Sequence, residues 1–144
     1  MSFSKKSLYN LYVTFFTQKG KKSVAKKNID RSLFIVSQHI KVPVSLVLYF
    51  YVLKLNILVE TRKVSSRKRT FIVPFPVVPR RRIFLALNWL KKGVTSNRSK
   101  IKLGDKLAFE ILRVISSKPC YVLKLKYSNF LKVIENRSFL YYRW

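Results

Sequence analysis

Clusters of arginine and lysine are the part of this sequence with the most chemistry to offer. Two clusters stand out: Lys19, Lys21 and Lys22 around one glycine, and Arg80, Arg81 and Arg82 directly behind a proline. The 144 residues hold 31 lysines and arginines but only five aspartates and glutamates, which gives a formal charge of +26. Because so few carboxylates can pair with these cations, they need an anionic partner, and polyphosphate is the one that this charge density favours.

Side chains that could perform catalysis are widely scattered. The acids are Asp30, Glu60, Asp105, Glu110 and Glu135, and His39 and Cys120 each occur once. No two carboxylates lie close in sequence, no cysteines or histidines have the spacing of a metal site, and the three glycines form no phosphate-binding loop. The sequence therefore predicts a protein that is not an enzyme and that uses no metal and no cofactor.

The apolar content shows that the chain folds. Hydrophobic residues make up 49% of the sequence, which excludes a disordered basic tail. The length predicts a single domain spanning residues 1–144. A high positive charge beside a real core is typical of proteins that bind RNA or DNA. On composition alone, an anionic membrane surface is the competing partner.

Residues 58–78 predict a β-hairpin. Two strand-like runs flank the polar, basic connector 65–69. It carries Arg67, Lys68 and Arg69, which we expect to contact RNA. Pro79 then suits the first turn of a helix, predicted over 80–93. Ile83, Leu87 and Leu90 recur at helical spacing on one side of it. The other side carries Arg81, Asn88 and Lys92, which we expect to contact RNA.

The remaining periodicity predicts helices over 7–17, 22–38, 44–55, 100–116 and 127–142. The predicted class is mainly α, with about six helices in a single-domain bundle and a hairpin protruding between the third and fourth helices. A connector before the last helix carries Lys124 and Lys126, interleaved with Tyr121 and Tyr127. Basic residues alternating with aromatic ones suit RNA, although both tyrosines could equally be packing residues.

The uncharged run 42–53 raises the question of a membrane span. A span needs about 20 predominantly apolar residues, whereas shorter runs are more often buried core helices. Pro43 near its start and Lys54 near its end favour a core helix, so no membrane span is expected. A membrane anchor is the alternative for this run.

The end of the chain carries a family pattern. Glu135-Asn136-Arg137-Ser138-Phe139-Leu140-Tyr141-Tyr142-Arg143-Trp144 resembles the closing helix of the small-subunit ribosomal protein S-seven family, which reads Asn-x-x-Phe-x-x-Tyr-Arg-Trp. Four further segments are similar to that family in order and spacing: Gly20-Lys21-Lys22-Ser23-x-Ala25, Val73-Pro74 with Pro79-Arg80-Arg81-Arg82, Leu85-Ala86-Leu87-Asn88-Trp89, and Leu107-Ala108-x-Glu110. Each segment is weak by itself, but together they cover nearly the whole chain.

The resemblance implies a six-helix protein that binds the 3′ domain of small-subunit ribosomal RNA and nucleates the head. It also implies neighbouring head and platform proteins as partners, and a hairpin close to exit-site tRNA and the messenger exit path. It assigns RNA contacts to Lys21, Lys22, Arg62, Lys63, Arg80, Arg81 and Arg82, and a helix-end site to Tyr142, Arg143 and Trp144, with Arg137 in the same ending. It places Trp89 in the core.

Departures from the family pattern indicate an organellar ribosome. A basic N-terminal arm is not seen, the chain ends at the Tyr-Arg-Trp motif, and Ser65-Ser66 replaces the usual Gly-Gly of the hairpin. Lys, Phe, Tyr, Ile and Asn are plentiful, as in the products of A/T-rich genomes, which organelles often have. We therefore expect the mitochondrial matrix, with a plastid as the alternative. The competing function is that of a free-standing nucleic-acid-binding protein, such as a nucleoid protein or RNA chaperone.

Overall fold

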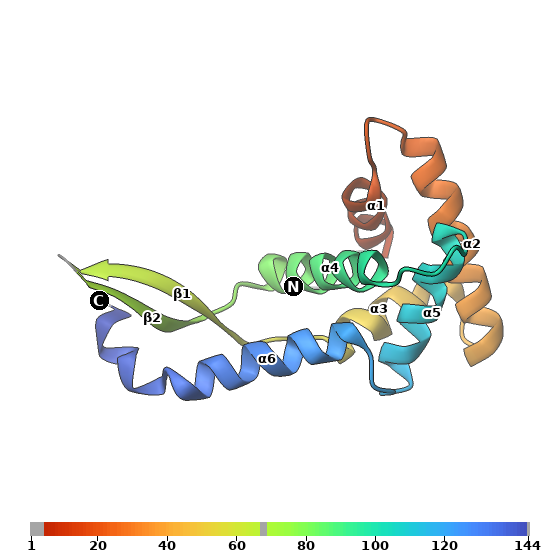
Figure 1. Cartoon of the computed structure of the whole chain (residues 1–144). Helices are drawn as coiled ribbons and strands as arrows, with labels where there is room; N and C mark the ends of the chain where they lie inside the picture. Colours follow the sequence, from red (N-terminus) through yellow and green to blue (C-terminus); the bar gives the residue numbers. More distant parts are fainter. Residues whose placement is uncertain (1–4, 67–68, 144) are drawn as a thin grey trace.

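The computed structural model describes residues 5–66 and 69–143, and these are mainly helical (Figure 1). The elements are α1 (Lys5–Phe16), α2 (Lys22–Ile40), α3 (Val44–Lys54), β1 (Val59–Ser66), β2 (Arg69–Pro76), α4 (Pro79–Ser96), α5 (Leu103–Ile115), α6 (Tyr121–Glu135) and the 3-10 helix η1 (Arg137–Arg143). The predicted class is confirmed, since the chain is mainly helical and an antiparallel hairpin lies between the third and fourth helices, α3 and α4.

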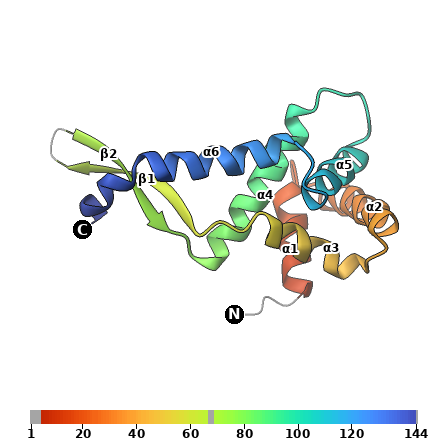
Figure 2. The same cartoon turned by 90° about the horizontal axis from the view of Figure 1, so that it is seen from below.

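The molecule has a thick body and a thin arm. Helices α1 to α5 pack together as the body, while the hairpin, the far half of α6 and η1 extend from it as the arm (Figures 1 and 2). Helix α6 packs on α4 at its start and on β1 further along, and η1 packs on β2. Because α6 contacts both parts, it fixes the direction in which the arm leaves the body.

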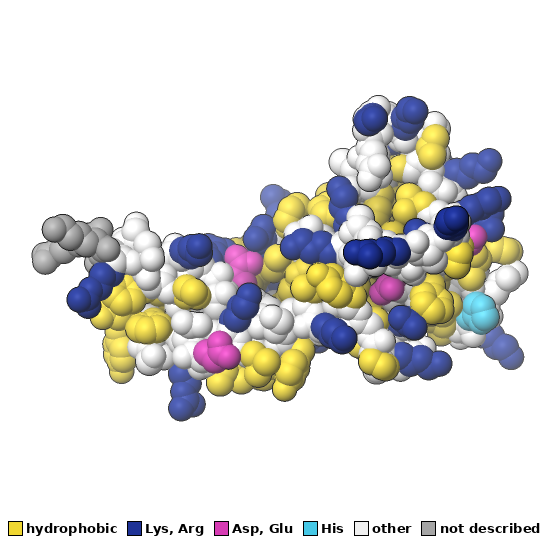
Figure 3. Space-filling view, viewed as in Figure 1, with side chains coloured by type: hydrophobic (Ala, Val, Ile, Leu, Met, Phe, Trp, Pro, Cys, Tyr) yellow, Lys and Arg dark blue, Asp and Glu magenta, His cyan; other side chains and the backbone are white. Residues whose placement is uncertain are grey.

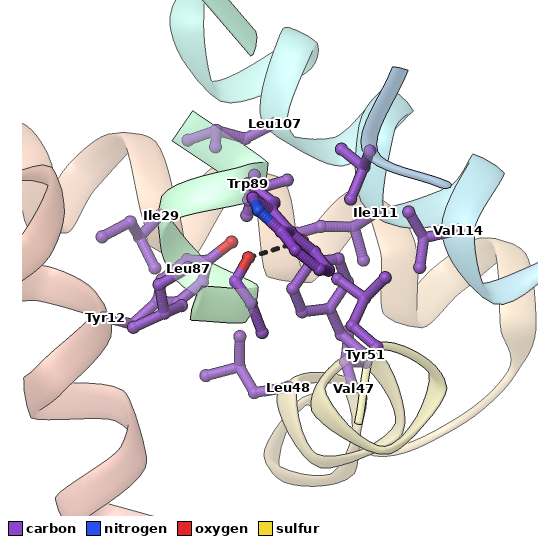
Figure 4. Close-up of a cluster of buried hydrophobic side chains, with 14 of the residues drawn as sticks. Tyr12, Ile29, Val47, Leu48, Tyr51, Leu87, Trp89, Leu107, Ile111 and Val114 are labelled. Atoms are coloured by element: carbon purple, nitrogen blue, oxygen red, sulfur yellow. Dashed lines mark hydrogen bonds between the residues drawn. The ribbon is translucent and has the colours of Figure 1, made fainter. Parts of the chain in front are cut away.

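The core of the body consists of apolar side chains at helical spacing. Ile29, Leu33 and Val36 of α2 are at most 1% exposed and belong to one buried cluster with Leu107 and Ile111 of α5. Figure 4 shows Ile29, Leu107 and Ile111 in this cluster. Trp89 of α4 is 8% exposed and belongs to the same cluster, as predicted. Truncating a side chain of this kind to alanine costs about 2–5 kcal/mol of stability, so these contacts hold the helices at fixed angles.

Two buried tyrosines offer a matched test of this core. The Tyr51 hydroxyl donates to the Ala86 carbonyl oxygen at 3.2 Å, whereas the buried Tyr12 hydroxyl has no hydrogen-bond partner among the described residues. We expect Tyr51→Phe to lower the free energy of unfolding by about 1 kcal/mol, and Tyr12→Phe to leave it unchanged or raise it, because an unsatisfied buried hydroxyl costs about 1–3 kcal/mol. Urea unfolding of both variants checks this, and equal losses would contradict it.

Helix α4 is longer than predicted. It continues to Ser96, so the expected end at residue 93 is wrong and Gly93 lies inside the helix. A Cβ atom on Gly93 would lie 2.6 Å from Cγ2 of Val122, closer than any ordinary contact. Gly93 therefore does not end the helix. Its lack of a side chain lets α6 pack closely against α4.

The last predicted helix, 127–142, is wrong at both ends. Helix α6 begins at Tyr121 and ends at Glu135, and residues 137–143 form the 3-10 helix η1. Val122 is fully buried and Leu125 packs against the core, so this start follows the usual helical spacing of buried residues. Alternation of lysine with tyrosine and leucine over 121–127 concealed that spacing in the sequence.

The hairpin is paired further than predicted. The register runs from Val59 opposite Pro76 to Ser66 opposite Arg69, so the ladder extends into both ends of the expected connector 65–69. Arg67 and Lys68 of that connector lie outside the described residues.

The uncharged run 42–53 forms most of α3, which buries Val47, Leu48 and Tyr51 in the core. Within 5–66 and 69–143, no single helix is long and apolar enough to cross a membrane, and α2 with α3 would pass that test only as a pair bent by 86°.

Candidate nucleic-acid interface

A basic groove of about 720 Å³ lies where the base of the hairpin meets α4 and α6. It is lined by Glu60, Thr61, Arg62 and Lys63 of β1, by Arg81, Leu85, Trp89 and Lys92 of α4, and by Leu125, Ser128, Asn129 and Lys132 of α6. Five of these side chains are cationic and one is a carboxylate. Figure 3 shows the wider surface, on which lysine and arginine side chains recur across body and arm with few acidic ones between them. The groove therefore concentrates positive charge in a concave site, where it acts most strongly on an anion.

The single carboxylate of the groove organises its arginines. Glu60 is only 8% exposed and accepts hydrogen bonds from Nε of Arg62 at 3.0 Å and from Nε of Arg81 at 3.2 Å. The guanidinium of Arg62 also lies over the Phe75 ring at 5.5 Å, and that of Arg81 over the Phe84 ring at 5.2 Å. Because one carboxylate binds two guanidinium groups, the group of Glu60, Arg62 and Arg81 keeps a net positive charge. The hydrogen bonds to Glu60 also fix the positions of both arginines.

Helical spacing explains how α4 and α6 supply the rest of the groove. Arg81, Leu85 and Trp89 recur every four residues along one face of α4, and Lys92 extends that face by one turn. On α6, the side chains of Ser128, Asn129 and Lys132 share a face for the same reason. The Asn129 amide donates to the Val59 carbonyl oxygen at 3.1 Å and so ties α6 to the base of the hairpin.

Comparison with known proteins identifies the family. The model of the family described as ribosomal protein S7p/S5e matches residues 2–128, which include all of the groove-lining residues except Asn129 and Lys132. The chain belongs to this family. It is therefore a structural ribosomal protein of the small-subunit type and not an enzyme. The resemblance seen in the sequence is confirmed.

Relatives in bacteria and in a mitochondrion support the assignment. The chain is 30% identical over 137 residues to the small ribosomal subunit protein uS7 of Thermomicrobium roseum, covering 95% of this chain and 86% of the relative. It is 38% identical over 128 residues to that of Pelobacter propionicus, covering 87% and 79%. It is also 34% identical over 85 residues to the small ribosomal subunit protein uS7m of Drosophila melanogaster, covering 57% and 38%.

The structure divides the arginine run of this S7p/S5e member among three surroundings. Arg81 lies in the basic groove with Glu60, and Arg82 donates through Nε to the Val77 carbonyl oxygen at 3.0 Å. Arg80 lines a different groove, between α1 and α4. The strand–helix junction therefore uses Nε of both Arg81 and Arg82, and Arg81 already shares the Glu60 carboxylate with Arg62. That all three arginines contact an outside anion stays a prediction.

The ending predicted to contact RNA also braces the hairpin. The Tyr142 ring stacks on the Phe71 ring with centroids 4.2 Å apart and planes 9° apart, and Arg143 donates to the Pro74 carbonyl oxygen at 2.6 Å. Arg137 is exposed at the start of η1, and Trp144 lies outside the described residues. Tyr142 and Arg143 thus have structural contacts that account for their place in the fold, whether or not RNA reaches them.

Because Tyr142 packs on Phe71 of β2, removing the Tyr142 ring should loosen the hairpin locally. Tyr142→Leu removes the stack on Phe71, which is worth about 0.5–1.5 kcal/mol, so we expect faster amide exchange along β2 with little change in the body. Tyr141→Leu is the matched control, because Tyr141 is 89% exposed. Hydrogen exchange with mass spectrometry separates the two, and equal rates in both variants would mean that the stack does not hold the hairpin.

Other predicted contact residues lie apart from the groove. Lys19, Lys21 and Lys22 are exposed around the turn between α1 and α2, where Lys19 and Gly20 have positive φ angles of 50° and 72°. Lys124 is exposed on α6, while Lys126 donates to the Lys54 carbonyl oxygen at 2.7 Å and burial lowers its pKa. Asn88 is half-buried on α4, and Arg69 is exposed at the far end of β2. Of the predicted contact residues that the structure describes, the basic groove brings together Arg62, Lys63, Arg81 and Lys92.

Four polar groove residues escaped the sequence analysis: Thr61 of β1, and Ser128, Asn129 and Lys132 of α6. The spacing of Ser128, Asn129 and Lys132 places them on one face of a helix. That face lines a groove only because α6 runs beside β1, which the sequence does not show. Within the described part of the chain, no three His, Cys, Asp or Glu side chains form a group that could hold a metal ion.

Proposed function

We propose that this S7p/S5e member binds the 3′ domain of small-subunit ribosomal RNA through the basic groove and nucleates assembly of the subunit head. The observation that carries the proposal is the convergence of five cations from β1, α4 and α6 on one concave site. Neutralising phosphates with such side chains supplies most of the affinity of a nucleic-acid complex. Family membership favours this function over that of a free-standing nucleoid protein or RNA chaperone.

Binding of two RNA fragments tests the proposal. We expect the purified protein to bind the 3′ domain of small-subunit RNA far more tightly than the 5′ domain at the same salt concentration. The affinity should fall with salt by nearly one logarithmic unit per phosphate contact for each tenfold increase. Equal affinity for both fragments would favour the free-standing nucleic-acid-binding function instead.

The organelle and the wider contacts belong to the same proposal. We infer a mitochondrial ribosome, which the similarity to the Drosophila protein named uS7m and the composition support, and a plastid ribosome is the alternative. The arm projects from the body and carries the exposed Arg69 at the start of β2, which suits a position near exit-site tRNA and messenger. Neighbouring head and platform proteins would cover exposed apolar side chains such as Tyr49 and Phe50 of α3. Gradient fractions of each organelle, probed for this chain and for small-subunit RNA, test the location.

A further inference from the structure

One acid of the body is buried at a point where three helices meet. Glu110 of α5 is only 4% exposed. A Cβ atom placed on Gly93 of α4 would lie 3.4 Å from Oε2 of Glu110 and 2.6 Å from Cγ2 of Val122 of α6. The carboxyl group of Glu110 therefore lies directly beside the close contact between α4 and α6.

This carboxyl group has too few partners for a charged group. Its Oε2 atom is buried and accepts no hydrogen bond from the residues that the structure describes. Burying a carboxylate without compensating hydrogen bonds is costly, so the site favours the neutral acid. In agreement with this, burial raises the pKa of Glu110, and the positive charge of Arg113 offsets only part of that effect.

Most charged side chains of the surrounding helices are engaged elsewhere. Tyr51 of α3 and Cys120 at the N-cap of α6 are the buried titratable groups of this region, and Arg113 lies over the Phe109 ring at 4.3 Å. The other charged groups have the following partners: Asp105 and Arg31 each other, Lys106 the Asn97 carbonyl oxygen, Lys126 the Lys54 carbonyl oxygen, Arg81 the Glu60 carboxylate, Arg82 the Val77 carbonyl oxygen and Lys91 the Phe15 ring. Arg80 and Lys92 of α4 line grooves, and Lys124 of α6 is exposed.

From this arrangement we infer that Glu110 makes the junction of α4, α5 and α6 sensitive to pH. The protonated side chain packs beside Gly93 and Val122 and keeps α6 close to α4. When its proton leaves to solvent, the carboxylate needs water, and the close packing at Gly93 leaves little room for it. Hydration then moves α6 away from α4. Because α6 extends into the arm (Figure 1), the direction of the arm changes with it.

The sign of the pH effect follows from the raised pKa. An unfolded glutamate has a pKa of about 4.3, whereas folded Glu110 keeps its proton to higher pH. Between these two pKa values the folded state binds more protons than the unfolded state, so stability falls as pH rises. Each unit of difference between them lowers the ratio of folded to unfolded protein about tenfold once both forms are ionised.

Two glutamine variants measure this dependence. Glu110→Gln cannot ionise, so its urea midpoint should rise relative to that of the wild type between about pH 4 and about pH 8. Glu135→Gln makes the same change at an exposed position of α6 and should follow the wild type. The change with pH is compared, since a buried amide lacking hydrogen bonds also lowers stability at every pH. Parallel pH profiles for Glu110→Gln and the wild type would overturn the inference.

The wild type gives a direct measurement that needs no variant to fold. The chain has three glutamates, so selective ¹³C labelling of their carboxyl groups gives three resonances, which the two glutamine variants assign. We expect the Glu110 resonance to titrate well above pH 4.3, the ordinary value of about 4.3 for a solvated glutamate being the reference. Titration at that ordinary value would also overturn the inference.

A distance across the molecule tests the movement of the arm. Gln38→Cys on α2 and Tyr141→Cys on η1 place nitroxide labels at exposed positions, and Cys120 is buried. Double electron–electron resonance should show the distance distribution change across the Glu110 titration, and remain constant when Glu110→Gln is added. A constant distribution in the wild type would leave Glu110 without effect on the arm and refute the inference. These experiments use the protein alone, so their failure would leave the proposed RNA binding untouched.

Discussion

Replacing Lys63, Lys92 and Lys132 together by alanine is expected to weaken binding to 3′-domain RNA about a hundredfold at about 0.15 M salt. The three side chains are exposed, come from β1, α4 and α6, and line one groove. Each phosphate contact contributes about 0.9 to the slope of log affinity against log salt, so loss of three contacts should lower that slope by two to three units. Filter binding over a series of salt concentrations measures both quantities.

A second triple variant separates the groove from general charge. Lys26, Lys27 and Lys41 are also exposed, but they belong to α2 and its C-cap and do not line the groove. Their replacement by alanine removes the same charge, so a purely long-range effect would reduce affinity as much as the groove variant does. We expect a loss several times smaller, and equal losses would show that the groove is not the binding site.

Gly93→Ala is expected to destabilise the protein and to impair RNA binding together. The new Cβ would lie 2.6 Å from Cγ2 of Val122, a side chain that is fully buried and has no room to move. Overpacking of this kind costs about 1–3 kcal/mol, and its relief requires α6 to move away from α4. Since α6 carries Lys132 and Asn129, the same movement would widen the basic groove.

Two further variants isolate the clash at Gly93. Ser96→Ala changes an exposed residue of the same helix and should alter the free energy of unfolding by no more than about 0.5 kcal/mol. Val122→Ala removes the clashing atom, so the double variant with Gly93→Ala should be less destabilised than the sum of the single changes. Strict additivity in chemical denaturation would mean that the two residues do not meet.

Much of the fold could be predicted because its helices carry a strong apolar period. Ile83, Leu87 and Leu90 predicted α4, and all three are buried. The start of α6 could not be predicted in this way. Lys124 and Lys126 alternate with leucine and tyrosine, and such alternation is not the pattern of an amphipathic helix. The length of α4 was missed for a different reason, since only a neighbouring helix shows that Gly93 is needed for close packing.

The candidate site was predictable in its chemistry and less so in its geometry. The arginines and lysines pointed to phosphate, but nothing local to residues 58–66 shows that Glu60 pairs with Arg81, a residue 21 positions away. That pairing depends on the angle between the hairpin and α4. The sequence therefore predicted a basic patch containing all three arginines, whereas Arg80, Arg81 and Arg82 face different surroundings.

Directed hydroxyl-radical probing is the most direct test of the central claim that the basic groove holds 3′-domain RNA. The chain has one cysteine, Cys120, which is buried, so a cysteine introduced at the surface can be tethered to iron selectively. Ser128→Cys places the iron in the groove, and Gln38→Cys places it on the exposed surface of α2. We predict strong cleavage of 3′-domain nucleotides from position 128 and weak cleavage from position 38. Cleavage from position 38 with none from position 128 would contradict the account.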